Sequence, residues 1–302
     1  MVDRLALKVD VDTLEGLQKG VPALLPLFER QGVQATFFLS FGPDQSGRAV
    51  RRVLRPGFLK KMVRTRAVQM YGLQTMLRGT LLPSRRIAAD SPELVREIEA
   101  AGHEVGIHAW NHALWQDRLP RMTRSQIESE LAQAIDAFEA CLGHSAHACA
   151  APAWMVTKDS LSVQDDLALD YCSDTRGAVP FLPKVGDRVF RTMQIPTTLP
   201  TLDEVLGRGG VDRTRYNEYL MERMQAPVEV HTIHAEAEGR AYLDLLDDLL
   251  ERLRAKGRKV IPLASLAMSV RREELAVHEL VLEEIPGRAG AVSLQGAGVA
   301  VG

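Results

Sequence analysis

The stretch RLALKVDVD, residues 4–12, decides how this chain is expected to fold. Apolar and β-branched residues alternate with other residues over Leu5–Val11, which predicts a β-strand. A helix is predicted next over Leu14–Arg30, because its apolar residues recur at helical spacing and Gly32 follows as a C-terminal glycine. The stretch VQATFFLSFG (33–42) is then typical of a buried strand. The chain therefore opens with a strand–helix–strand unit.

The same alternation continues for most of the chain. Further strands are expected at HEVGIHA, SAHACAAPAW, DYCSD, MQIPTTLP, VEVHTIHAE and KVIPLASLA, with helices between several of them. About seven or eight strand-then-helix units favour an α/β fold with a parallel sheet. From about Arg271 the pattern dissolves into a Gly- and Ala-rich tail, so residues 271–302 are expected to be a weakly ordered extension of a catalytic domain spanning 1–270.

Size and composition indicate a globular protein. The chain has 302 residues, of which 46% are hydrophobic and 25% charged, enough for one large α/β domain or two smaller ones. The stretch MVDRLALKVD becomes charged before a signal peptide could form, and no apolar run is long enough for a transmembrane helix. The three cysteines show no paired metal-ligand spacing. A cytoplasmic protein with reduced thiols is therefore expected.

Basic residues are concentrated in one segment, residues 48–86. It holds eleven Lys and Arg and no acidic residue, which leaves 26 basic against 39 acidic residues in the rest of the chain. Apolar spacing near three and four predicts amphipathic helices within it, typical of an element that lies on an anionic membrane surface. A solvated basic face and a nucleic-acid site are the alternatives. Nucleic acid is not expected as a partner, because aromatic residues for base stacking are nearly absent there.

Five ionisable residues stand where predicted strands end: Asp10 and Asp12, then His108 and His112, then His234. In a (β/α) barrel the carboxyl ends of the strands converge on one face, where active sites are built. A distorted barrel of about seven parallel strands is therefore favoured over an open sheet. One aspartate and the two histidines of HAWNH would form a facial ligand set for Zn²⁺ or another divalent first-row ion.

Each of these residues also has an ordinary structural interpretation. An HxxxH pair alone is more often a polar turn, and an Asp-x-Asp at a strand end is commonly a turn or helix cap. His234 alone would be a half-buried histidine with a partner. Their combination at three strand ends favours a site, whereas His103 and His231 lack a comparable argument.

The motifs VDVDT, GHEVGIHAWNH and TIHAE, in this order, resemble the NodB-homology polysaccharide deacetylase family over roughly residues 5–269. The stretches LSFGPDQSGR, YGLQTMLRGT, SDTRGAVPF, QIPTTLPTLDEV and TIHAEAEG are similar to one branch of it, the 4-deoxy-4-formamido-L-arabinose-phosphoundecaprenol deformylases. The resemblance implies removal of a formyl group from an aminosugar carried on a polyprenyl phosphate. The implied setting is the cytoplasmic face of the inner membrane, where the product feeds lipid A modification and resistance to cationic peptides such as polymyxin.

The resemblance also implies roles for the five residues. Asp12, His108 and His112 become ligands of one divalent metal ion (Zn, or Co, Ni or Mn), Asp10 the catalytic base and His234 the general acid.

The chain departs from the wider family at one position. The loop where many members carry Arg-Pro, with the arginine orienting the catalytic aspartate, has Ala151-Pro152 here. Arg176 is the candidate for orienting Asp10, and Trp154 is a second candidate for contacting substrate or supporting the site.

Two other functions remain open from the sequence. One is an N-deacetylase acting on soluble or wall polysaccharide or oligosaccharide. The other is a non-enzymatic basic protein that binds membrane or nucleic acid. The full set of two aspartates and three histidines favours an enzyme, and the basic segment favours a lipid-borne substrate.

Overall fold

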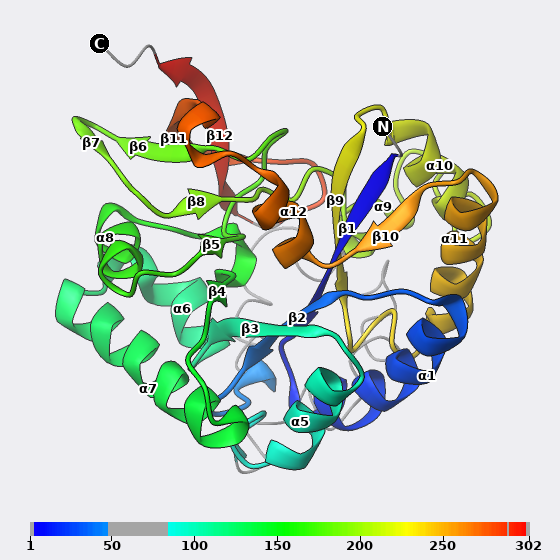
Figure 1. Cartoon of the computed structure of the whole chain (residues 1–302), viewed down its shortest axis with the longest axis horizontal. Coiled ribbons are helices and arrows are strands. Elements are labelled where there is room, and N and C mark those ends of the chain that lie inside the picture. The colour runs from blue at the N-terminus through cyan, green and yellow to red at the C-terminus, as the bar shows by residue number, and fades with distance from the viewer. Residues whose placement is uncertain (1–2, 48–83, 289, 300–302) are drawn as a thin grey trace.

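A parallel sheet forms the centre of the computed structural model, which describes residues 3–47, 84–288 and 290–299 (Figure 1). Its eight strands in the described part of the chain are β1 (Arg4–Val11), β2 (Thr36–Ser40), β3 (Glu104–Ala109), β4 (Ala148–Cys149), β5 (Tyr171–Cys172), β8 (Met193–Gln194), β9 (Val228–His234) and β10 (Lys259–Ile261). All of their pairings are parallel. The expected α/β class with a parallel sheet is confirmed.

The strand β1 is central to the sheet. Its residues 4–10 pair with β9 along one edge, so β10, at residues 4–6, and β2, at residues 8–11, share the other edge in succession. From β2 the order continues through β3, β4, β5 and β8. The segment after β8 returns to β9, where Thr198 and Leu199 N–H groups donate to the carbonyl of Val230. The ring thus closes through irregular backbone, which makes it a distorted barrel.

The helices surround the sheet (Figure 1). They are η1 (Gly16–Gly20), α1 (Val21–Gln31), α5 (Pro92–Ala100), α6 (His112–Arg118), η3 (Leu119–Arg121), α7 (Arg124–Leu142), η4 (Pro152–Trp154), α8 (Lys158–Asp166), α9 (Leu202–Val205), α10 (Tyr216–Arg223), α11 (Leu243–Ala255), α12 (Leu263–Ser269) and η5 (Arg272–Glu274). The helix expected over Leu14–Arg30 therefore begins as a π-helical turn. Gly20, the last residue of this turn, packs closely on the segment after β9: a Cβ there would lie 2.1 Å from the carbonyl oxygen of Ala235, so only glycine fits.

Alternation along β1 separates two environments. Leu5, Leu7, Val9 and Val11 belong to the large apolar core that includes α1 and α11 residues. The residues between them point into the barrel. There Ala6 packs in a smaller core with Phe38, Ala148, Tyr171, Met193 and Val230. The polar residues on this inner face, Lys8 and Asp10, are therefore placed inside the barrel by the same alternation that builds the core.

The C-terminal tail is not the weakly ordered extension that the sequence predicts. Strands β11 (Val277–Glu284) and β12 (Ala291–Val299) form an antiparallel hairpin that joins β6 (Leu182–Val185) and β7 (Arg188–Val189) in a second, four-stranded sheet. The hairpin itself is a local pairing of β11 with β12, and β11 also pairs with β6, about a hundred residues earlier, an attachment that the tail's own sequence does not record.

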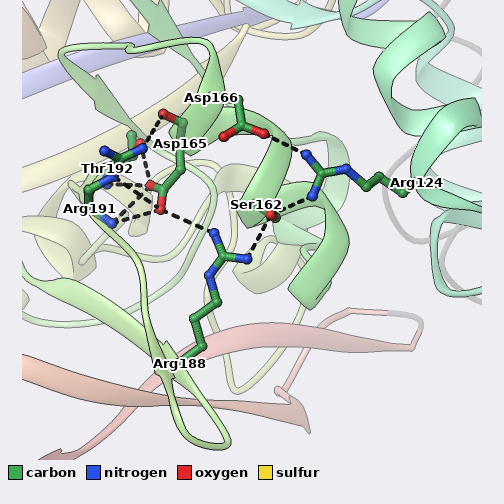
Figure 2. A network of polar contacts seen from close by, with 7 residues as sticks. All are labelled: Arg124, Ser162, Asp165, Asp166, Arg188, Arg191 and Thr192. Atoms are coloured by element: carbon green, nitrogen blue, oxygen red, sulfur yellow. Dashed lines mark hydrogen bonds and ion pairs between the residues drawn. The ribbon is translucent and has the colours of Figure 1, made fainter.

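A network of arginines and carboxylates attaches the segment around β7 to the helices (Figure 2). Arg124 of α7 and Arg188 of β7 both donate to Ser162 Oγ of α8, at 2.7 and 2.8 Å. Asp165 accepts from the backbone N–H groups of Arg191 and Thr192 at 2.8 to 3.0 Å. The second sheet is thereby anchored beside α7 and α8.

The basic segment 48–86, with its expected amphipathic helices and membrane contact, lies outside the described residues except for residues 84–86. Pro43 and Arg86 form an antiparallel bridge, and Asp44 N–H donates to the Arg85 carbonyl at 2.8 Å. None of the described helices is both long and apolar enough to cross a bilayer.

Candidate metal centre and active site

Three of the residues predicted as metal ligands lie together. Asp12 directly follows β1, His108 lies in β3 and His112 is the first residue of α6. Nε2 of His108 is 3.2 Å from Asp12 Oδ1, and Nε2 of His112 is 3.3 Å from Asp12 Oδ2. One ligand atom from each of the three lies within 4.8 Å of the other two. The arrangement is a compact N,N,O site.

Local structure explains how two histidines four positions apart converge. His108 still belongs to the strand, whereas Asn111 caps the next helix by accepting a hydrogen bond from Leu114 N–H at 3.0 Å. The chain therefore turns between the two histidines and starts α6 at His112, so both rings face the same carboxylate. Their centroids are 5.2 Å apart.

The hydrogen bond of His108 fixes which nitrogen can bind a metal. Nδ1 lies 2.7 Å from the carbonyl oxygen of Ala150, which can only accept, so Nδ1 carries the proton and Nε2 keeps its lone pair. This is the outer-sphere contact that metal-binding histidines typically have. Oδ1 of Asp12 and Oδ1 of Asp10 are buried and accept no hydrogen bond from the described residues. The residues present therefore fit a divalent cation.

The charges of the site favour the same conclusion. Burial opposes ionisation of Asp12, but His112 and His108 hold the pKa of this carboxyl well below its usual range. Burial also opposes protonation of His108, yet Asp10 and Asp12 raise the pKa of this imidazole above its usual value. An ionised Asp12 beside two imidazoles, with the Asp10 carboxylate near His108, gives an anionic site that attracts a cation.

Asp10 and His234 complete the set. They are direct register partners on the neighbouring strands β1 and β9, and His234 is the last residue of its strand. Because partners in register present their side chains to the same face, both belong to the inner face on which Asp12 also ends. All five predicted residues thus come from the carboxyl ends of three strands.

Arg176, the candidate for orienting Asp10, is bonded to other residues. Its guanidinium donates to the Thr197 carbonyl, to Glu204 Oε1 and to the Leu199 carbonyl, at 3.1, 2.7 and 3.0 Å. These bonds use the side chain to hold the segment after β8, so it does not orient Asp10. The sequence places Arg176 shortly after a strand, but only the fold shows which neighbour its long side chain reaches.

Trp154, the second candidate for contacting substrate or supporting the site, is a buried residue. Its indole is 2% exposed, and Nε1 donates to Thr197 Oγ1 at 3.1 Å. The guanidinium of Arg176 lies 5.0 Å from the ring centroid and that of Arg288 lies 4.5 Å away. Two guanidinium groups therefore pack against this buried ring.

Sequence reasoning missed two acidic residues that follow His234. Glu236 Oε1 accepts from the backbone N–H of Asp12 at 3.1 Å, and Glu238 Oε2 accepts from the backbone N–H of His234 at 2.9 Å. Burial and the nearby charge of Asp12 raise the pKa of Glu236 well above its usual value, and burial raises the pKa of Glu238 to about 7. The signal that could have found them is HAEAEG, two acids in an otherwise apolar stretch.

Two further histidines lie outside the site. His103 Nδ1 accepts from Ala35 N–H at 3.2 Å, and its ring packs against Phe28 and Phe37. His231 is buried with neither ring nitrogen bonded among the described residues, and burial, aided by Arg176 and His234, lowers its pKa to about 3. It lies three positions before His234 on β9, so its side chain is on the opposite face of the sheet from His234 and Asp10.

Comparison with known proteins places the chain in a family. The sequence profile of the polysaccharide deacetylase family matches residues 3–172. The crystal structure of a proposed polysaccharide deacetylase from Mycobacterium smegmatis superposes with a TM-score of 0.64 at 18% identity, covering 94% of this chain and 96% of that one. A T48 deacetylase with substrate gives a TM-score of 0.53 at 15% identity, covering 89% of this chain and 93% of that one. The chain belongs to the polysaccharide deacetylase family.

Two relatives that match nearly the full length of the chain carry a more specific name than the family does. A protein from Shewanella sediminis is 35% identical over 97% of this chain and 95% of its own length. One from Wigglesworthia glossinidia brevipalpis is 30% identical over 93% of this chain and 98% of its own. Both are named probable 4-deoxy-4-formamido-L-arabinose-phosphoundecaprenol deformylase ArnD. This membership supports a hydrolase that acts on an amide bond.

Proposed function

We propose that the chain removes the formyl group from 4-deoxy-4-formamido-L-arabinose carried on undecaprenyl phosphate. The observation that carries the proposal is the convergence of Asp10, His234 and the Asp12–His108–His112 cluster at the carboxyl ends of β1, β3 and β9. The choice of substrate comes from the two relatives that match nearly the whole chain. The products are formate and the free aminosugar lipid.

A single divalent ion (Zn, or Co, Ni or Mn) would be held by Asp12, His108 and His112. When bound, such an ion lowers the pKa of water and polarises the formamide carbonyl.

The chain's own residues handle the protons. Asp10 takes one proton from the attacking water as the water oxygen bonds to the formyl carbon. His234, on the neighbouring strand, gives a proton to the sugar nitrogen as the carbon–nitrogen bond breaks. The leaving group is thus a neutral amine, and the formyl carbon departs as formate.

The charge of the basic segment, together with the described residues on either side of it, supports a membrane-borne substrate. Gly42 N–H donates to the carbonyl of Trp110 at 2.9 Å, and Trp110 stands between the ligands His108 and His112. Ile87 N–H in turn donates to the carbonyl of Gly42 at 2.8 Å, so the described chain on both sides of 48–86 lies next to the turn that carries the two histidines. The eleven basic residues of 48–86 suit an anionic bilayer, each contributing on the order of 1 kcal/mol near such a surface. This arrangement fits a peripheral enzyme at the cytoplasmic face of the inner membrane that serves lipid A modification and polymyxin resistance.

The amide-release assay tests the chemistry. Purified protein receives formylated or acetylated aminosugar polyprenyl phosphate, and formate and acetate are quantified with the bound metal. Formate release should exceed acetate release, cease on chelation and return with a divalent ion. Acetate release at an equal or higher rate would instead favour the polysaccharide N-deacetylase alternative, and full turnover in verified metal-free protein would exclude the metal scheme.

The membrane part has its own test, flotation with anionic liposomes. The protein should float with the vesicles at low salt and dissociate as salt is raised, because exposed charges are screened. A protein that stays at the bottom of the gradient at low salt does not bind the bilayer through 48–86.

A further inference from the structure

A lysine is fully buried inside the barrel next to the catalytic aspartate. Lys8 lies on β1 two residues before Asp10, so both side chains face the inner surface of the sheet. Its side chain has no solvent exposure, and Nζ lies 3.5 Å from Asp10 Oδ2. Burial of an ammonium group is costly in free energy unless the group is paired with an opposite charge, and Asp10 provides that charge.

The ammonium group is held in a fixed place. Nζ donates to the Ser173 carbonyl oxygen at 3.0 Å. The rings of Phe38 and Trp154 stand 5.3 and 5.7 Å from Nζ, measured to their centroids. Lys8 is thus positioned by three elements, β2, the loop after β4 and the segment after β5, and can in turn position what it touches.

Asp174 is a second buried carboxylate near Lys8: burial raises its pKa, and hydrogen bonds and the charge of Lys8 oppose that rise. Its two oxygens are already occupied, because Oδ1 accepts from Ala151 N–H and Oδ2 accepts from the side-chain amides of Gln164 and Gln194. The direct ion pair of Lys8 is therefore the one with Asp10.

The two oxygens of Asp10 are unequal as a result. Oδ2 faces the ammonium group, whereas Oδ1 is buried and accepts no hydrogen bond among the described residues. The loop after β4 has Ala151-Pro152 and offers no cation of its own at that point.

We propose that Lys8 is the positioning residue for Asp10. It holds Oδ2 so that Oδ1 is the oxygen turned toward the water that attacks the amide. The inference rests on the proposed function, because it assigns a task to Lys8 in that reaction. Lys8, which lies on the same strand as Asp10, thus takes the orienting role that the sequence suggested for Arg176.

The test compares Lys8→Met, which keeps the length and loses the charge, with Lys8→Arg, which keeps the charge. Lys8→Met should lower kcat on the order of 10–100-fold while KM and metal content stay unchanged. Lys8→Arg should recover most of the turnover. Asp174→Asn is the matched control, since it removes a buried charge near Lys8 and should leave kcat close to that of the unaltered protein.

Crystal structures give a readout independent of turnover. In Lys8→Met the Asp10 carboxylate should rotate from its place on β1, and in Lys8→Arg it should stay. Unchanged kcat in Lys8→Met, or an equal loss in Asp174→Asn, would overturn the positioning role. If the unaltered protein releases no formate, the proposed function fails, and the orientation of Asp10 in these structures still decides whether Lys8 positions it. Should Lys8→Met not fold, Lys8→Gln takes its place.

Discussion

Asp10 and His234 are direct partners across the parallel strands β1 and β9. The proposed base and the proposed acid are therefore held on one inner face by backbone hydrogen bonds of the sheet rather than by loops. The candidate metal ligands include Asp12, only two positions beyond Asp10. Rigid placement of this kind matters because proton transfer requires groups within hydrogen-bond reach of the reacting atoms.

The roles of ligand and base can be separated by substitution. His108→Ala should lose both metal and turnover, because one of three ligands is removed. Asp10→Asn should keep the metal and lower kcat on the order of 100–10,000-fold, because it removes only the base. Metal analysis and kinetics on the same samples check this, with exposed His147→Ala as the control. Loss of metal from Asp10→Asn would make Asp10 a ligand instead.

The two glutamates after β9 should have different effects. Glu236→Ala removes the acceptor of the Asp12 backbone and should weaken metal affinity on the order of 10–100-fold. Glu238→Ala removes the acceptor of the His234 backbone, so it should lower kcat and leave metal affinity unchanged. Metal titration beside steady-state kinetics distinguishes the two. Identical behaviour of the two variants would show that neither glutamate acts on its own neighbour.

Glu238 should make the stability of the metal-free protein depend on pH. Its pKa rises from the usual 4.5 to about 7 because the side chain is buried. Between these values the folded protein binds the extra proton and the unfolded chain does not, so the contribution is present below pH 4.5 and is lost as pH rises toward 7. Glu238→Gln should flatten this part of the profile of unfolding free energy. A profile that keeps its slope in Glu238→Gln would assign the dependence to another group.

Two glycines of the C-terminal hairpin offer a matched pair. Gly287 and Gly290 both have positive φ, at 94° and 97°, so alanine at either costs backbone strain of about 1–3 kcal/mol. Only at Gly287 would the new Cβ lie 2.1 Å from the Glu204 carbonyl oxygen, whereas at Gly290 it meets nothing within 4 Å. Gly287→Ala should therefore cost about 1–3 kcal/mol more than Gly290→Ala. Denaturant unfolding measures both, and equal costs would mean that the turn is not packed against Glu204.

The sequence by itself determined the parallel α/β class and the five residues of the candidate site. Both follow from local information: alternation over Leu5–Val11 predicts the strand, and the polar residues Asp10, Asp12, His108, His112 and His234 stand where such strands end. Parallel strands then bring these ends together, whatever the details of packing.

Only the tertiary structure decided what surrounds those residues. Lys8 bonds to Ser173, 165 positions away, and Arg176 bonds to Glu204 instead of Asp10. The tail forms a β11–β12 hairpin, and only the fold shows that β11 also pairs with the distant strand β6. Such contacts depend on which side chains the fold brings within a few ångströms of one another. A periodic pattern along the chain does not predict which distant residues will be neighbours.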